Sequence, residues 1–115
     1  MREGAGITEL AFLRVRDSHG PAFEAAFAGA AGLVKRAEGH LGHRLVRALD
    51  HADLYLLEVH WRDLAAHVEV FEASEAHAVL METLEPFLVD EPHVIHVPAH
   101  PGMDLPRQQP RRGAA

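Results

Sequence analysis

The stretch WRDLAAHVEVFEASEAHAVLMETLEPFL, residues 61–88, decides the fold, because a strand gives way there to a helical region. Trp61 closes the apolar run DLYLLEVHW, in which side chains alternate as they do in a strand. Apolar residues then recur at helical spacing over residues 64–72 and again over residues 74–85. Ser74 is placed to begin the second helical piece, since its hydroxyl can accept a hydrogen bond from a free N–H there.

Three further strands and another helix can be placed on either side of this stretch. ITELAFLRVR is apolar on both faces, so we expect a strand that is covered on both sides. The turn DSHGP places Pro21 in the first turn of a helix, where its missing N–H is not needed. HLGHRLVRALD, with Leu41, His43 and Leu45 on one face, lies close enough to the next strand to form a hairpin with it. The strands are expected at residues 7–16, 40–50, 53–62 and 91–99, and the first helix at residues 21–37.

The order β-α-β-β-α-β is that of the ferredoxin-like α+β fold, a four-stranded antiparallel sheet with helices on one face. The first three strands are apolar on both sides, but a chain of 115 residues has no further element to cover the second face. A second copy packed sheet against sheet is the simplest cover, so the sequence predicts a homodimer. Residues 1–98 are expected to form this domain, followed by a flexible Pro/Arg-rich tail at residues 99–115.

Composition argues against several classes of protein. The formal net charge is −6 with no basic stripe, so neither a nucleic-acid nor an anionic-membrane partner is expected. The absence of cysteine excludes disulfides and zinc–thiolate sites. The beginning MREGAGITEL lacks the apolar core of a signal peptide, and no apolar run approaches the roughly 20 residues that span a bilayer. We therefore expect a cytoplasmic protein.

Several segments together resemble the antibiotic biosynthesis monooxygenase domain: EGHLGHRL, the hairpin to LYLLEVHW, and RDLAAHVEVFEASEAH with the ending LEPFL. The resemblance covers roughly residues 7–98 and implies a dimeric α+β barrel. The family includes quinone-forming oxygenases, haem-degrading enzymes and members without known activity. For this chain the resemblance implies cofactor-independent oxidation of an aromatic or polyketide-like substrate in an apolar pocket.

The resemblance carries over to individual residues. The quinone-forming members use a tryptophan that ends a strand, which matches Trp61. They also use an aromatic hydroxyl at the position that falls on His67, and an asparagine where this chain has Leu57. The haem-degrading members ligate iron with a histidine that matches His77 in SEAH, and they have an asparagine on the first strand. This sequence contains no asparagine, so neither residue set is complete.

Each of these residues also has a structural interpretation. Trp61 closes an apolar strand and can belong to the core, with an indole N–H that needs a partner when it is buried. His67 can likewise be a structural histidine. His77 lies at the edge of the apolar stripe of its helix, where its ring can be half buried. An imidazole, whose pKa in a free histidine is about 6.5, suits proton transfer at neutral pH and, when neutral, iron binding.

We therefore expect a homodimeric, cofactor-independent monooxygenase that acts on a hydrophobic small molecule. His77 or His67 is the expected base, and Trp61 is the expected hydrogen-bond donor. Two alternatives remain open: a haem-binding or haem-degrading protein with His77 as iron ligand, and a non-catalytic, small-molecule-binding stress-response dimer. The missing asparagine favours the second of these alternatives over the first.

The remaining histidines include two pairs at i, i+3 spacing, His40 with His43 and His93 with His96. On a strand this spacing places the two side chains on opposite faces, so neither pair is expected to chelate a metal ion. No dedicated metal site is therefore expected.

Glu58 and His60 alternate with Trp61 and are expected on the helix-free face of the sheet. A carboxylate buried there needs a partner, and Arg44, Arg47 or His60 can supply one. We expect an ion pair at the interface between two copies.

Overall fold

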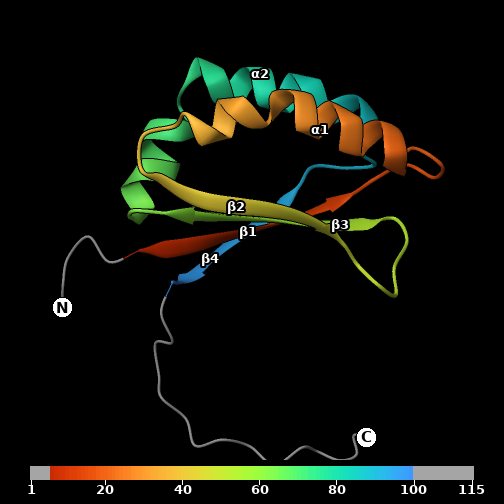
Figure 1. Ribbon diagram of the computed structural model, residues 1–115, viewed down its shortest axis with the longest axis horizontal. Coiled ribbons are helices and arrows are strands. Elements are labelled where there is room, and N and C mark those ends of the chain that lie inside the picture. Colours follow the sequence, from red (N-terminus) through yellow and green to blue (C-terminus); the bar gives the residue numbers. More distant parts are fainter. Residues whose placement is uncertain (1–5, 100–115) are drawn as a thin grey trace, which may run out of the picture.

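The computed structural model describes residues 6–99, which form one four-stranded antiparallel sheet with two helices across one face (Figure 1). The strand order is β2-β3-β1-β4, so the predicted ferredoxin-like α+β fold is confirmed. From residue 100 on, the tail expected at residues 99–115 lies outside the described residues. The elements are β1 (Ile7–Arg14), α1 (Gly20–Lys35), β2 (His40–Arg47), β3 (Leu54–Trp61), the π-helix η1 (Ala66–Phe71), α2 (Glu75–Leu84), the 3-10 helix η2 (Glu85–Phe87) and β4 (His93–Pro98).

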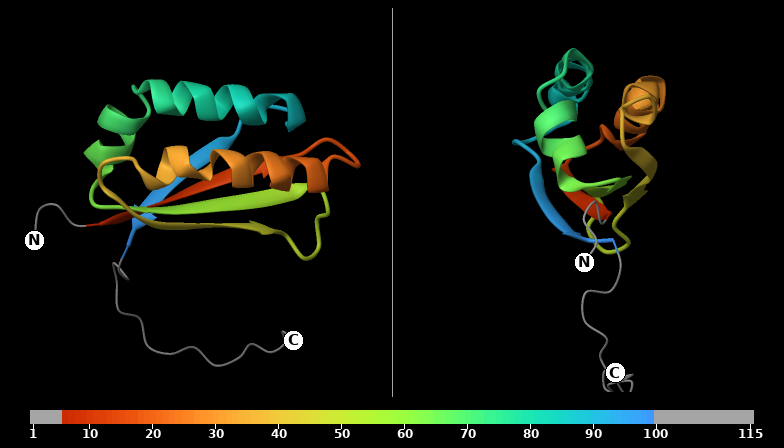
Figure 2. Two further views of the ribbon diagram at one scale, coloured as in Figure 1. Left: turned by 45° about the horizontal axis from the view of Figure 1, so that its top comes forward. Right: turned by 90° about the vertical axis from the view of Figure 1, so that its left-hand side faces the viewer.

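The predicted alternation of β3 is confirmed. Its side chains at every second position, Tyr55, Leu57, Val59 and Trp61, are buried between the sheet and the helices. Figure 2 shows both helices on this side of the sheet and none on the other. Helix α1 packs onto this face through Phe23, Phe27, Ala30 and Val34, which recur at helical spacing.

Gly39 lies in the turn between α1 and β2, and its φ of +88° is in the left-handed region that favours glycine. A Cβ atom at this position would lie 2.6 Å from the Cβ of Ala66. The turn therefore passes against the start of η1 at a distance that only glycine allows.

The expectation that His40 and His43 lie on opposite faces is wrong. The pairing of β2 with β3 shifts register between His40 and Gly42, as in a β-bulge. Because of this shift both rings lie on one side, with Nε2 of His40 only 2.9 Å from Nδ1 of His43. Leu41, which was expected to share the face of His43, is instead 67% exposed.

The helix-free face carries the ion pair expected around Glu58. Arg44 donates two hydrogen bonds to this carboxylate, from Nε at 3.1 Å and from Nη2 at 3.2 Å. His60 lies on the same face, with Nδ1 within 3.0 Å of the Thr8 hydroxyl. Both partners of the ion pair belong to one chain, so its place at an interface stays a prediction. Among the described residues, no helix combines the length and the apolar character that a membrane span requires.

Candidate functional site

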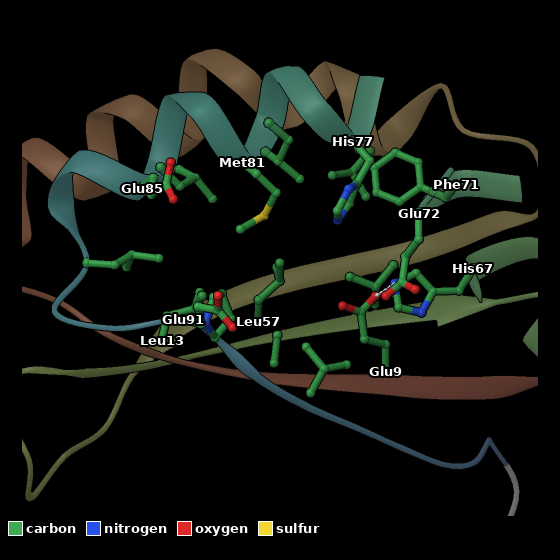
Figure 3. Close-up of a pocket in the computed structure, with 18 of the residues that line it drawn as sticks. Glu9, Leu13, Leu57, His67, Phe71, Glu72, His77, Met81, Glu85 and Glu91 are labelled. Atoms are coloured by element: carbon green, nitrogen blue, oxygen red, sulfur yellow. Dashed lines mark ion pairs between the residues drawn. The ribbon is translucent and has the colours of Figure 1, made fainter. Parts of the chain in front are cut away.

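A cavity of about 510 Å³ lies between the sheet and α2 (Figure 3). Most of its wall is apolar, with Leu13, Leu57 and Val59 on the sheet side and Leu80, Met81 and Leu84 on the helix side. Its titratable side chains gather in two places. Glu9, His67, Glu72 and His77 lie around one end, while Glu85 and Glu91 lie toward the other. Asp90, the neighbour of Glu91 in sequence, also lines the cavity.

The first end is built around the carboxyl group of Glu9, which points from β1 into the space under the helices (Figure 3). Trp61 donates a hydrogen bond of 2.9 Å from its indole Nε1 to Oε1 of Glu9. Nε2 of His67 lies 3.2 Å from the same oxygen and 3.4 Å from Oε2 of Glu72. The rings of Trp61 and His67 stack at 5.1 Å with an interplanar angle of 18°. One carboxyl oxygen is thus held by two stacked aromatic side chains.

The π-helix η1 explains why His67 and Glu72 reach the same spot. The backbone N–H of Glu72 donates to the carbonyl of His67 at 2.8 Å, the five-residue step of a π-helix. This wider turn places residues five apart over one another, whereas an α-helix places residues three or four apart on one face. The spacing of apolar residues predicts a helical piece at residues 64–72, but it does not predict the π geometry of this piece.

His96, on the edge strand β4, adds a further polar contact to the group formed by Glu9 and His67. In the β1–β4 pairing it lies directly opposite Glu9, and its side chain therefore shares the face of the sheet on which Glu9 lies. Its Nε2 is 2.8 Å from Nδ1 of His67. Glu9, His67 and His96 therefore form a continuous chain of polar contacts, although the last two are 29 residues apart.

Burial shifts the pKa values of Glu9 and His67 in opposite directions. Burial raises the pKa of Glu9 from 4.5 to about 7; the Trp61 hydrogen bond opposes this change and the charge of Glu72 adds to it. Burial also lowers the pKa of His67 from 6.5 to about 4, and the neighbouring His96 and His77 lower it further. At neutral pH the imidazole of His67 is therefore neutral, while the raised pKa of Glu9 lies close to the pH of the solution. Such a carboxyl group can both give and take a proton at neutral pH.

His77 lies on the helix wall of the same cavity. Its backbone N–H donates to Oγ of Ser74 at 3.2 Å, which confirms Ser74 as the N-cap of α2. Its ring packs edge-on against Phe71 at 5.3 Å and reaches down toward the space above Glu9 (Figure 3). The three residues selected from the sequence, His77, Trp61 and His67, thus all line one cavity.

Glu9, Glu72 and His96 were not among the site residues predicted from the sequence. A signal for Glu9 was present, because it is the only charged residue among those of β1 that face the core with Ala11 and Leu13. Period-two alternation places this glutamate on the buried face, where a carboxyl group needs a partner. Neither Glu72 nor His96 had a comparable signal.

Neither a metal ion nor a haem fits these side chains well. Within residues 6–99, no three histidine or carboxylate side chains are arranged to hold a metal ion. Five carboxyl groups line the cavity, but Arg16 is the only arginine or lysine among its described lining residues. The propionate groups of a haem would therefore meet like charges. His77 faces the cavity, but the other groups around it do not suit this cofactor.

Comparisons with known proteins point to one family. The family model of the antibiotic biosynthesis monooxygenases matches residues 6–83, more than half of the chain. A search of curated proteins found no match. Among solved structures, a candidate antibiotic biosynthesis monooxygenase from Bordetella bronchiseptica is 28% identical with a TM-score of 0.78, and the alignment covers 81% of this chain and 95% of that one.

Two further structures share the fold at lower identity. SnoaB, a cofactor-independent oxygenase from Streptomyces nogalater, is 23% identical with a TM-score of 0.71, over 90% of this chain and 99% of its own. A candidate monooxygenase from Caulobacter crescentus is 19% identical with a TM-score of 0.73, over 84% of this chain and 92% of its own.

Proposed function

This chain belongs to the antibiotic biosynthesis monooxygenase family, and we propose that it oxidises an aromatic or polyketide-like substrate in its cavity without a cofactor. The main support is the cavity itself, whose apolar wall suits a flat hydrophobic molecule and whose one end gathers proton-exchanging groups. The similarity in fold to SnoaB, a cofactor-independent oxygenase, is consistent with this chemistry.

The proposed reaction needs no bound oxidant other than O₂. A base removes a proton from an activated ring carbon, such as the CH₂ group of an anthrone-like phenol, and leaves a carbanion that can reduce O₂. The balanced overall change is CH₂ + O₂ → C=O + H₂O. A water-poor cavity protects the carbanion from simply regaining a proton from solvent.

We assign the role of the base to His77. Both ring nitrogens of His67 already have neighbours at 2.8 and 3.2 Å, so this residue has no nitrogen left for a substrate. Trp61 donates its N–H to Glu9. We therefore assign Trp61 and His67 to positioning that carboxyl group, whereas His77 faces the open part of the cavity.

Oxygen uptake by the purified protein with a panel of anthrone-like phenols tests this function. We expect consumption of one O₂ per substrate molecule by the wild type and a loss of at least 100-fold in His77→Ala, in line with the usual contribution of a general base. His51→Ala, which removes an exposed histidine from the turn between β2 and β3, is the control and should retain full activity. Tight binding of the phenols without oxygen uptake would instead support the non-catalytic binding role.

The helix-free face supports a homodimer as part of this proposal. Seven apolar side chains on this face remain partly accessible in a single chain: Leu10, Phe12, Val46, Leu54, Leu56, Ile95 and Val97. Figure 2 shows that nothing among the described residues covers this side of the sheet. An apolar strip of this kind in a soluble assembly is best covered by its own copy, because a two-fold contact pairs the strip with itself.

A further inference from the structure

The carboxyl group of Glu9 is the most deeply buried acid that lines the cavity, with the whole residue 7% exposed. Each element packed around it presents a titratable or polar group: Trp61 from β3, His67 and Glu72 from η1 and its end, His77 from α2, and His96 from β4. Among the described residues, neither lysine nor arginine pairs with it. Nothing with a permanent positive charge among these residues therefore stabilises an ionised Glu9. These surroundings suit a carboxyl group that gains and loses a proton.

The contacts beyond Glu9 lead out of the cavity. Its Oε1 is 3.2 Å from Nε2 of His67, and Nδ1 of His67 is 2.8 Å from Nε2 of His96. A neutral imidazole donates at one nitrogen and accepts at the other, so a proton that arrives at one side can be released at the other. His96 is only partly buried and lies on β4, one of the two edge strands of the sheet. The path therefore runs from the cavity to solvent.

We propose that Glu9 is a catalytic acid of this site and that His67 and His96 form the relay that returns its proton from solvent. This proposal, which rests on the function proposed above, adds a residue and a proton route to it. The pKa of about 7 that burial gives to Glu9 agrees with such a role.

The oxidation requires a proton donor as well as a base. After the first C–H proton passes to His77 and the carbanion adds O₂, the peroxide anion regains this proton from His77 and becomes a hydroperoxide. The second C–H proton then passes to His77 as the O–O bond breaks and the C=O bond forms. The departing oxygen receives the proton of Glu9 and leaves as water. Each turnover thus leaves one extra proton on His77 and one proton missing from Glu9. His77 releases its proton to solvent as the product leaves, and Glu9 regains a proton through His67 and His96.

Turnover measurements with two matched histidine variants test the relay. His96→Ala removes the outer relay group, whereas His51→Ala removes an exposed histidine from the turn between β2 and β3, away from the cavity. We expect kcat to fall at least 10-fold in His96→Ala with KM unchanged, and to recover when imidazole is added to the buffer. We expect no change in His51→Ala. Equal kcat values for His96→Ala and the wild type would overturn the relay. His96→Gln provides a second variant if the alanine variant does not fold.

Nuclear magnetic resonance tests the same groups without any substrate. With ¹⁵N-labelled histidine and ¹³C-labelled glutamate, the proposal requires a neutral His67 at pH 7 and a Glu9 carboxyl group that titrates near neutral pH. A cationic His67 beside an ionised Glu9 from pH 5 to pH 8 would be a static ion pair and would refute the relay. If these titrations appear as expected but no phenol is oxidised, the relay stands and the proposed function fails.

Discussion

The substitution Glu9→Gln tests the protonation of the buried carboxyl group through the stability of the protein. Glutamine keeps an oxygen that can accept the Trp61 hydrogen bond but cannot ionise. In the wild type the pKa of Glu9 is about 7 in the folded chain, against an ordinary 4.5. The folded state therefore binds this proton more tightly than the unfolded state. The stability that Glu9 contributes is fully present below pH 4.5 and is lost as the pH rises through 7.

At roughly 1.4 kcal/mol for each pKa unit, the difference between 4.5 and about 7 corresponds to about 3 kcal/mol. The unfolding free energy of Glu9→Gln should therefore rise by about 3 kcal/mol relative to that of the wild type between pH 4 and pH 8. Urea unfolding at fixed protein concentration can measure this difference through the fluorescence of Trp61, the only tryptophan and fully buried.

Glu82→Gln is the control for this experiment, since the side chain of Glu82 is exposed on α2. Its difference from the wild type should be almost the same at every pH. If the curves of Glu9→Gln and the wild type also ran parallel from pH 4 to pH 8, the carboxyl group would be ionised in the folded protein. The assignment of Glu9 as a proton donor would then be refuted.

Three further substitutions test the dimer, a turn and a helix cap. Leu56→Glu places a charge in the apolar strip of the helix-free face and should separate the two copies. Light scattering should then give the mass of a single chain, 12.6 kDa, instead of twice that mass. Leu49→Glu, which changes a side chain in an exposed turn, is the control and should leave the dimer intact. Gly39→Ala should lower the free energy of unfolding by an amount on the order of 1–3 kcal/mol, because alanine is strained at this φ and its Cβ meets Ala66. An unchanged midpoint of urea unfolding would contradict this account of the turn. Ser74→Ala should cost about 1 kcal/mol, since a free N–H of α2 loses its cap, and an equally stable variant would show that this bond contributes nothing.

The fold could be predicted from sequence because its determinants are local and repeated. Alternation along residues 53–61 and helical spacing along residues 21–37 each recur over many positions, so a single exception does not change the result. Ser74 was recognised for the same reason, because the chemistry of a helix cap depends only on its own neighbours.

The sequence-based predictions failed where a local irregularity changes the backbone geometry of a strand or helix. The bulge after His40 turns the expected i, i+3 separation of two histidines into a direct contact. Gly42 stands at this shift, and glycine in a strand often marks a bulge, but a glycine alone does not determine that the register changes there. The π-helix has a similar effect by bringing Glu72 over His67. In both cases tertiary packing selects a backbone geometry that local propensity does not specify.

The site itself was found in part. Trp61, His67 and His77 were selected, and they do line one cavity, but the carboxyl group around which two of them are arranged was not selected. Glu9 was identifiable as a charged residue on a core-facing strand. The contact of His67 with His96 depends on the pairing of β1 with β4, and only the folded chain shows this pairing.

The most direct test of the central claim is oxidation of an anthrone-like phenol by the purified protein under ¹⁸O₂, with mass analysis of the product. The proposed reaction predicts one ¹⁸O atom in the new carbonyl group of each product molecule and the second in water. It also predicts that added haem or flavin does not increase the rate. A product without ¹⁸O, or an oxidation that proceeds only with an added cofactor, would contradict a cofactor-independent monooxygenase.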